Sequence, residues 1–176
     1  SVGPVVAPLG VTGVARGLVL DLLPGATAVT DVVASARGAV TLAPRVRTVV
    51  EVGGHLSRWM LLKEDGDLAD FAVSEMCAAG AGAFLEQQAT RLKLPVSEFA
   101  DLAARASRGA TVAGRCTVFA KSDMIHLQQK GTPVEEIAYG LCLALARNFQ
   151  ASVLRGHRVV TPVATVGGGT ADAGLV

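Results

Sequence analysis

Apolar residues recur at helical spacing in the last third of the chain. Between residues 133 and 154 they return every four positions, which places them on one side of a helix. Thr132, Pro133 and Glu135 supply the cap, the first helical position and the acidic residue of a capping box at its start. Shorter helices are predicted over residues 30–38, 83–92, 98–105 and 123–130. The apolar stripe of the long helix consists of Ile137, Leu141, Leu145, Phe149 and Val153.

Runs rich in valine and leucine predict strands in the middle of the chain and near its end. The first of these runs ends at Gly53 and Gly54, and the last ends at Gly167. Residues 64–67, Glu-Asp-Gly-Asp, are a hairpin turn signal, and apolar runs such as 18–23 predict short strands or turns. Strands that precede helices, with glycines at the junctions, indicate an α/β layer fold. The main strands are expected over residues 46–52, 58–63, 68–73 and 159–166.

Composition narrows the class of protein. Of the 176 residues, 51% are hydrophobic and 18% are charged, which excludes an intrinsically disordered segment. Sixteen basic and fifteen acidic residues give a net charge of +1, so no nucleic-acid partner is expected. No apolar run of about 18 residues lacks a charge, a proline or a glycine, so no membrane partner is expected. Three cysteines are too sparse for a disulfide scaffold, which favours a cytoplasmic location.

Two of the cysteines stand just before predicted helices. Cys77 precedes the sequence Ala-Ala-Gly-Ala-Gly and Cys116 precedes Thr-Val-Phe, whereas Cys142 lies inside the long helix. All three are compatible with buried core positions, although a helix N-terminus beside Cys77 or Cys116 would favour a thiolate. A zinc site would need further ligands, and the sequence has neither a Cys-x-x-Cys pair nor a nearby histidine pair. If the first two bind metal, a two-fold symmetric dimer would supply the four thiolates of a cubane iron–sulfur cluster.

Glycines at three junctions form a second candidate site. They let backbone amides approach a phosphate, although each junction is also compatible with a plain turn. The sequence has no Walker A motif and no dinucleotide Gly-x-Gly-x-x-Gly motif. His55 follows one glycine pair, where it can face a nucleotide or only solvent, and no nucleophile elbow supports a hydrolase built on Ser57. The glycines are Gly53 and Gly54, Gly80 and Gly82, and Gly167, Gly168 and Gly169.

Three segments resemble the motifs of one protein family. Residues 50–58, VEVGGHLSR, resemble the phosphate motif I-G-G-Q-D-S-K. Residues 70–86, DFAVSEMCAAGAGAFLE, resemble D-F-x-M-N-D-K-C-A-A-G-T-G-R-F-L-E, and residues 116–123, CTVFAKSD, resemble C-T-V-F-A-E-S-E. These motifs are typical of the activator ATPases of 2-hydroxyacyl-CoA dehydratases and of the related ATPase subunits of benzoyl-CoA reductase. The resemblance runs from Gly10 to Val176.

The resemblance implies an α/β fold of the ribonuclease H-like, actin-like ATPase type, with a mixed sheet flanked by helices. Residues 1–44 would be the remnant of a first lobe and the inter-lobe connection, and residues 45–176 a second lobe with the cluster-binding segment. The resemblance also implies a homodimer that holds one 4Fe–4S cluster between its subunits, with Cys77 and Cys116 as ligands from each protomer. ATP with Mg²⁺ would bind at the glycine junctions, His55 and Ser57. Its hydrolysis would drive a low-potential electron into a partner dehydratase or reductase.

The sequence departs from the family pattern at the nucleotide motifs. The first phosphate motif of the family, D-x-G-S-T, is absent, and the chain begins without an initiator methionine. His55 and Leu56 stand where the family has Gln-Asp, which removes a carboxylate suited to Mg²⁺ or to the attacking water. The simplest interpretation is a second lobe of a longer protein, with little or no ATPase activity by itself. The alternative function is that of a non-catalytic actin-like lobe that serves in assembly or regulation.

Overall fold

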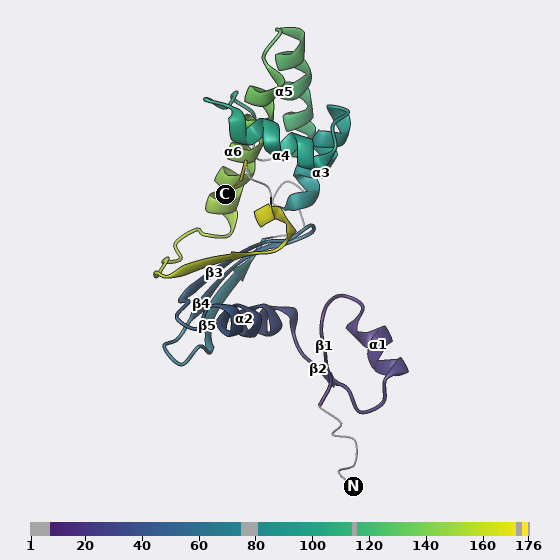
Figure 1. The fold of residues 1–176 in the computed structure, drawn as a ribbon, viewed down its shortest axis with the longest axis vertical. Helices are drawn as coiled ribbons and strands as arrows, with labels where there is room; N and C mark the ends of the chain where they lie inside the picture. The colour runs from purple at the N-terminus through teal and green to yellow at the C-terminus, as the bar shows by residue number, and fades with distance from the viewer. Residues whose placement is uncertain (1–7, 75–80, 114–115, 172–173, 176) are drawn as a thin grey trace.

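A four-stranded sheet lies at the centre of the fold, with one helix on one face and a layer of helices on the other (Figure 1). The computed structural model describes residues 8–74, 81–113, 116–171 and 174–175. Outside the sheet, a two-residue parallel pair, β1 (Gly10–Val11) and β2 (Thr27–Ala28), flanks helix α1 (Arg16–Leu22). The predicted α/β class, a mixed sheet flanked by helices, is confirmed.

The sheet combines an antiparallel meander with one parallel strand. The three strands of the predicted meander are neighbours in the order in which they follow each other along the chain. The last strand pairs in parallel with the first strand of the meander, with Val166 opposite Glu51. Because parallel strands end at the same edge of a sheet, the residues that follow these two strands lie close together. In the sheet order β5-β4-β3-β6, the strands are β3 (Thr48–Val52), β4 (Ser57–Leu62), β5 (Leu68–Val73) and β6 (Val163–Val166).

The two faces of the sheet belong to two different hydrophobic cores, since successive side chains of a strand point to opposite faces. Val49, Met60 and Leu62 pack on one face against helix α2 (Asp31–Leu42). Trp59 and Leu61 face the other way and pack with residues near the end of helix α6 (Val134–Ser152). The largest core lies mainly between the helices of the helical layer and reaches the sheet at Val52 of β3.

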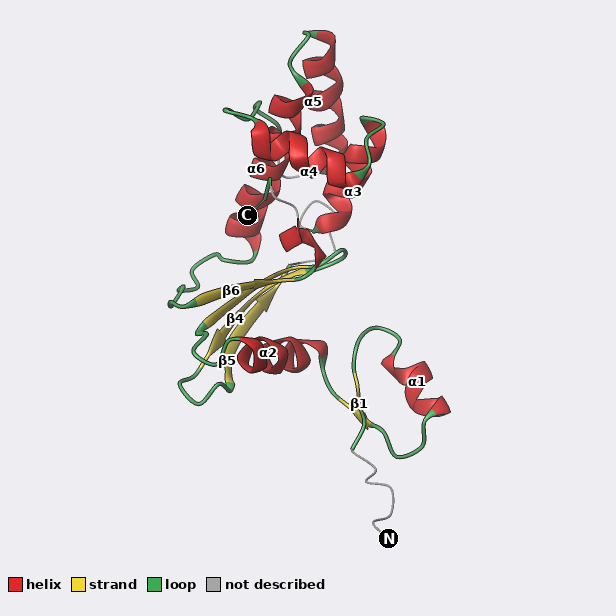
Figure 2. Cartoon of the chain, viewed as in Figure 1, coloured by secondary structure: helices red, strands yellow, loops and turns green. Residues whose placement is uncertain are grey.

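The helical layer confirms the long helix that the apolar stripe predicts. Ile137, Leu141 and Leu145 on α6 are buried in the core that α6 shares with its neighbouring helices. All four helices of this layer lie on the same side of the sheet (Figure 2). Within the ranges that the structure describes, no helix combines the length and the apolar character needed to cross a bilayer. The other three helices are α3 (Gly82–Arg91), α4 (Val96–Arg105) and α5 (Thr117–Gln129).

The predicted capping box at the start of α6 is wrong. The cap position is Pro133, and no side chain caps the helix. Thr132 instead ends the preceding helix, because its N–H donates to the Leu127 carbonyl while the Gly131 N–H donates to the Gln128 carbonyl, both at 3.0 Å. With Gly131 at φ 73°, these two bonds form a Schellman motif. The geometry at Thr132 is therefore set by the end of α5.

Other predicted elements also differ from the structure. Helix α2 runs to Leu42, four residues beyond the predicted end at residue 38. Residues 18–22 of the run predicted as a strand or turn are helical in α1, because periodicity alone does not assign a short apolar run. Helix α5 begins at Thr117 and not at residue 123. Its first turn was missed because Val118 and Phe119 are exposed and do not form part of a buried apolar stripe. Strand β6 begins only after Pro162, which has no N–H to donate to a ladder.

Candidate functional site

The glycine segments after β3 and β6 come together at one edge of the sheet. Gly167 follows β6 with φ 95°, a backbone conformation that favours glycine. A Cβ atom at this position would lie 2.5 Å from the Val52 carbonyl oxygen at the end of β3. At Gly169 a Cβ atom would lie 2.5 Å from Cγ1 of the same valine. The close approach of the two segments therefore requires residues without side chains.

The start of α3 joins the same edge through backbone hydrogen bonds. The Gly82 N–H donates to the Gly53 carbonyl and the Ala83 N–H donates to the Gly54 carbonyl, both at 2.8 Å. Gly53 in turn donates its N–H to the Leu56 carbonyl at 2.9 Å, which closes the β3–β4 turn. These α3 amides are already paired, so they do not approach a phosphate in the way that the sequence suggests for Gly82. What this helix end offers a ligand is its dipole and a surface without side chains.

A cavity of about 490 Å³ opens where the three segments meet. Its volume lies within the range of small-molecule sites. Glycines and other small residues form much of its wall, and Glu86 of α3 and Ser97 of α4 add polar groups. In Figure 2 the short 3₁₀ turn η2 (Gly168–Ala171) follows β6 next to the start of α3. The lining residues are Gly54, Gly82, Ala83, Leu85, Glu86, Val96, Ser97, Ala100, Gly168, Gly169 and Ala171.

The cavity gathers four of the predicted glycines but not every predicted side chain. Gly54, Gly82, Gly168 and Gly169 line it, whereas Gly80 and Cys77 lie outside the described residues. His55 is exposed in the β3–β4 turn and is not part of the wall. Ser57 is fully buried and lines a separate cavity of about 160 Å³ between the sheet and α6, together with Phe149.

Sequence reasoning missed the two polar groups of the wall. Glu86 follows Gly82 by four residues, a spacing that places both on the same side of α3, and this signal was available in the sequence. Ser97 lies just before the helix predicted over 98–105, whereas α4 begins at Val96 with Pro95 at its cap position. The approach of Ser97 to Glu86 depends on how α3 and α4 pack, which no local pattern encodes.

Glu51, the carboxylate that precedes the β3–β4 turn in sequence, is already in an ion pair. Arg58 on β4 is only 6% exposed, and its Nη1 lies 3.1 Å from Oε2 of Glu51 on β3. Its Nη2 binds a carboxylate oxygen of Asp31, the first residue of α2. A buried guanidinium needs such partners, because an uncompensated buried charge is strongly destabilising. This ion-pair network ties the start of α2 to the sheet.

Cys116 occupies the cap position of α5. Its side chain is partly exposed, at the N-terminal end of a 13-residue helix. Val118 and Phe119, which follow it, are 65% and 63% exposed. Among the described residues no three histidine, cysteine or acidic side chains form a potential metal site. Cys116 therefore lies next to an uncovered apolar surface.

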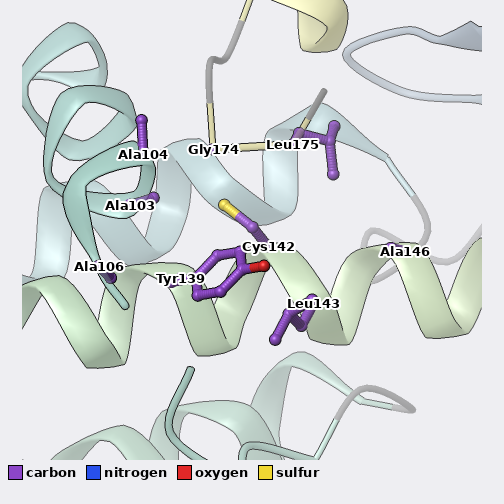
Figure 3. A pocket seen from close by; sticks show the side chains of 9 residues that line it. All are labelled: Ala103, Ala104, Ala106, Tyr139, Cys142, Leu143, Ala146, Gly174 and Leu175. Carbon is purple, nitrogen blue, oxygen red and sulfur yellow. The ribbon is translucent and has the colours of Figure 1, made fainter. Parts of the chain in front are cut away.

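Cys142 has a different environment. It is 1% exposed on α6 and belongs to the large helical core, which confirms the prediction of a buried core residue. Its sulfur lies at a cavity of about 400 Å³ between α4 and α6, together with Tyr139 and Leu143 (Figure 3). Several alanines and Leu175, near the end of the chain, complete the wall of this cavity (Figure 3).

Known proteins resemble this chain in sequence over most of its length. The sequence profile of the BadF/BadG/BcrA/BcrD ATPase family matches residues 5–176. The 2-hydroxyisocaproyl-CoA dehydratase activator of Clostridioides difficile is 30% identical over 141 residues, which cover 80% of this chain and 53% of that protein. The (R)-2-hydroxyglutaryl-CoA dehydratase activating ATPase of Acidaminococcus fermentans is 35% identical over 111 residues, which cover 63% and 42%. The chain spans about half the length of the curated relatives it matches.

Solved structures agree with this similarity. The activator of the 2-hydroxyisocaproyl-CoA dehydratase from Clostridium difficile, with bound ADPNP, aligns with a TM-score of 0.87 at 27% identity. That alignment covers 96% of this chain and 62% of the other. Component A of the Acidaminococcus fermentans (R)-2-hydroxyglutaryl-CoA dehydratase aligns with a TM-score of 0.86 at 29% identity, over 94% of this chain and 62% of the other.

Proposed function

Since this chain belongs to the BadF/BadG/BcrA/BcrD ATPase family, we propose that it is part of an ATP-dependent activator that passes a low-potential electron to an acyl-CoA dehydratase or reductase. Residues 45–176 would form the second ATPase lobe, and residues 1–44 the remnant of the first lobe with the inter-lobe connection. The observation that carries the proposal is the meeting of three glycine segments around one cavity of about 490 Å³.

The cavity fits the parts of a nucleotide. The glycines at its edge leave room for phosphates, and the positive end of the α3 dipole lies beside them. The Glu86 carboxylate can accept hydrogen bonds from ribose hydroxyls, while Val96 and Ala100 offer apolar contact for a base. The relative that was solved with bound ADPNP has the same fold, which supports a nucleotide as the ligand.

A 4Fe–4S cluster shared by two copies of the chain is the second part of the proposal. Cys116 would be one ligand in each protomer, and Cys77, outside the described residues, would be the other. The cap position of α5 suits a thiolate ligand, and the exposed Val118 and Phe119 would be covered where two copies meet. When bound, the cluster would supply the low-potential electron. The chain's contribution is to hold the thiolates and to exclude water around them.

Replacing Glu86 with glutamine is expected to weaken ADPNP binding roughly tenfold, because a charged acceptor of ribose hydrogen bonds is lost. Isothermal titration calorimetry with Mg²⁺ and ADPNP measures the change. Glu98→Gln is the matched control, since Glu98 is also exposed but lies outside the cavity wall. Equal affinities of the Glu86 and Glu98 variants would contradict the ribose contact, and a wild-type chain that binds no ADPNP would contradict the nucleotide site.

A second candidate function is nucleotide binding without hydrolysis, in a lobe that serves assembly or regulation. It is favoured by the β3–β4 turn, where His55 and Leu56 provide no carboxylate. Glu51 and Asp31, the acidic groups that pair with Arg58, are already engaged. No carboxylate of this turn is therefore available to orient Mg²⁺ or a water molecule.

The Leu56→Asp variant distinguishes the two functions. If only this carboxylate is missing, the variant is expected to hydrolyse ATP about tenfold faster or more, because a positioned base contributes at least that much. Leu56→Asn is the control of the same size without the charge. Phosphate release is measured for the wild type and both variants. Hydrolysis by the wild type well above the background rate would contradict the second candidate, and equal rates for the Asp and Asn variants would contradict the role of the carboxylate.

A further inference from the structure

The segment that leads to Cys116 crosses α6 at close range. We call residues 106–113, between α4 and Cys116, the Cys116 loop. The Ala110 N–H donates to the Glu136 carbonyl in the first turn of α6 at 2.8 Å. The Arg108 Nε lies 3.0 Å from Oε1 of the same glutamate. Glu136 of α6 therefore binds the Cys116 loop through both its backbone carbonyl and its side chain.

The crossing depends on two glycines. A Cβ atom at Gly140 of α6 would lie 2.2 Å from the Ala110 carbonyl oxygen. A Cβ atom at Gly109 of the loop would lie 2.7 Å from Cδ1 of Leu143 and 3.1 Å from the Gly140 nitrogen. The two backbones thus touch where neither has a side chain. Val112, the next apolar residue of the loop, is buried in the core of the helical layer.

The far end of the Cys116 loop is held by α5 itself. The Ala113 N–H donates to Oδ2 of Asp123 at 2.8 Å. Asp123 lies on α5 about two helical turns after Cys116, because a turn contains about 3.6 residues. Arg147 of α6 adds a longer contact from its Nη2 to the Val112 carbonyl, at 3.4 Å. Val112 and Ala113 are thereby fixed to both helices.

We propose that Asp123 and Gly140 are positioning residues for the Cys116 thiolate. In this account α6, and not α5 alone, determines where the thiolate lies. The inference rests on the proposed function, in which Cys116 is a ligand of a cluster shared by two copies. Such a ligand has to be held within about 0.5 Å of its place. Helix α5 restrains only the chain that follows Cys116. The hydrogen bond from Ala113 to Asp123 and the contact between Gly109 and Gly140 restrain the Cys116 loop, which precedes it.

A nitroxide attached to Cys116 tests the restraint without any cluster. The carrier is the Cys77→Ser/Cys142→Ala protein, in which Cys116 is the remaining thiol. Asp123→Ala is expected to add a mobile component to the electron paramagnetic resonance spectrum. Asp123→Asn keeps a side-chain oxygen that accepts the same hydrogen bond, so its spectrum should remain that of the parent. Ser122→Ala is the neighbouring control, since this hydroxyl donates to the Val118 carbonyl of its own helix.

A nitroxide spectrum that is unchanged by Asp123→Ala would overturn the inference. Gly140→Ala is expected to mobilise the label as well, and if this variant does not fold, by circular dichroism, the Asp123 series alone decides the question.

The reconstituted chain with all its cysteines provides the second measurement. Asp123→Ala is expected to lose iron to a chelator about tenfold faster than Asp123→Asn, the usual scale for residues that support metal ligands. If the wild type binds no iron, the proposed function fails while the nitroxide spectra still decide the restraint. Equal iron loss from the two Asp123 variants would overturn the role of Asp123 toward the cluster.

Discussion

Replacing Gly167 with alanine is expected to abolish ADPNP binding and to lower the free energy of unfolding by about 3 kcal/mol. The alanine would have to adopt φ 95° and place its Cβ 2.5 Å from the Val52 carbonyl oxygen. The end of β6 would then move away from β3, and the glycine segments would no longer meet at the cavity. Urea unfolding and calorimetric titration with ADPNP measure the two effects.

Gly156→Ala is the matched control for this prediction. Gly156 also has a positive φ, 75°, but an added Cβ atom would meet nothing within 4 Å. It is expected to cost only about 1 kcal/mol of stability, from backbone strain, and to leave ADPNP affinity unchanged. If both variants lose the same stability and the same affinity, the close approach of Gly167 to β3 has no special role.

Replacing Cys116 with serine is expected to eliminate bound iron, because a serine hydroxyl does not become an anionic ligand under the conditions in which a cysteine thiol does. The dimer should weaken as well, since the shared cluster would no longer bridge the two copies. Iron and acid-labile sulfide are determined after anaerobic reconstitution, and the mass of the particle by light scattering. Cys77→Ser should behave in the same way.

Cys142→Ala is the control for the cysteine series. Cys142 is buried in the helical core, so the variant should keep its iron and its dimer. Iron that survives the loss of Cys116 would contradict the assignment of this ligand. If iron is lost only in the Cys142 variant, Cys142 in the helical core would be the cluster ligand instead of Cys116.

The sequence was sufficient for those parts of the fold that carry strong local signals. The antiparallel meander follows from β-branched runs and the turn around Gly66, and the bounds of β5 were predicted to the residue. The buried side of α6 follows from its four-residue period. In both cases the local pattern and the final packing agree.

The errors arise where tertiary contacts decide the outcome. Thr132 looks like a helix cap in the sequence. In the structure the Thr132 N–H instead takes part in the Schellman motif that ends α5, together with the N–H of Gly131. Helix α5 could not be traced to Thr117, because the exposed Val118 and Phe119 interrupt any apolar stripe. For a short element with little burial, such as α1, the sequence pattern is equally compatible with a helix and with a strand.

The sequence identified glycines that line the candidate site, but not the polar side chains of its wall. Glycines at three junctions were predicted as a candidate phosphate site, and Gly54, Gly82, Gly168 and Gly169 line one cavity. His55 and Ser57 are close to Gly54 in sequence, yet they lie away from the cavity. Proximity along the chain does not determine direction, because successive residues of a strand face opposite sides.

The most direct test of the account is the iron and acid-labile sulfide content of the anaerobically purified chain, with its visible spectrum and its oligomeric state. A 4Fe–4S cluster shared by two copies predicts a coloured dimer with about two iron atoms per protomer. A colourless, iron-free protein that also resists reconstitution would contradict electron delivery and leave the non-catalytic actin-like lobe as the function.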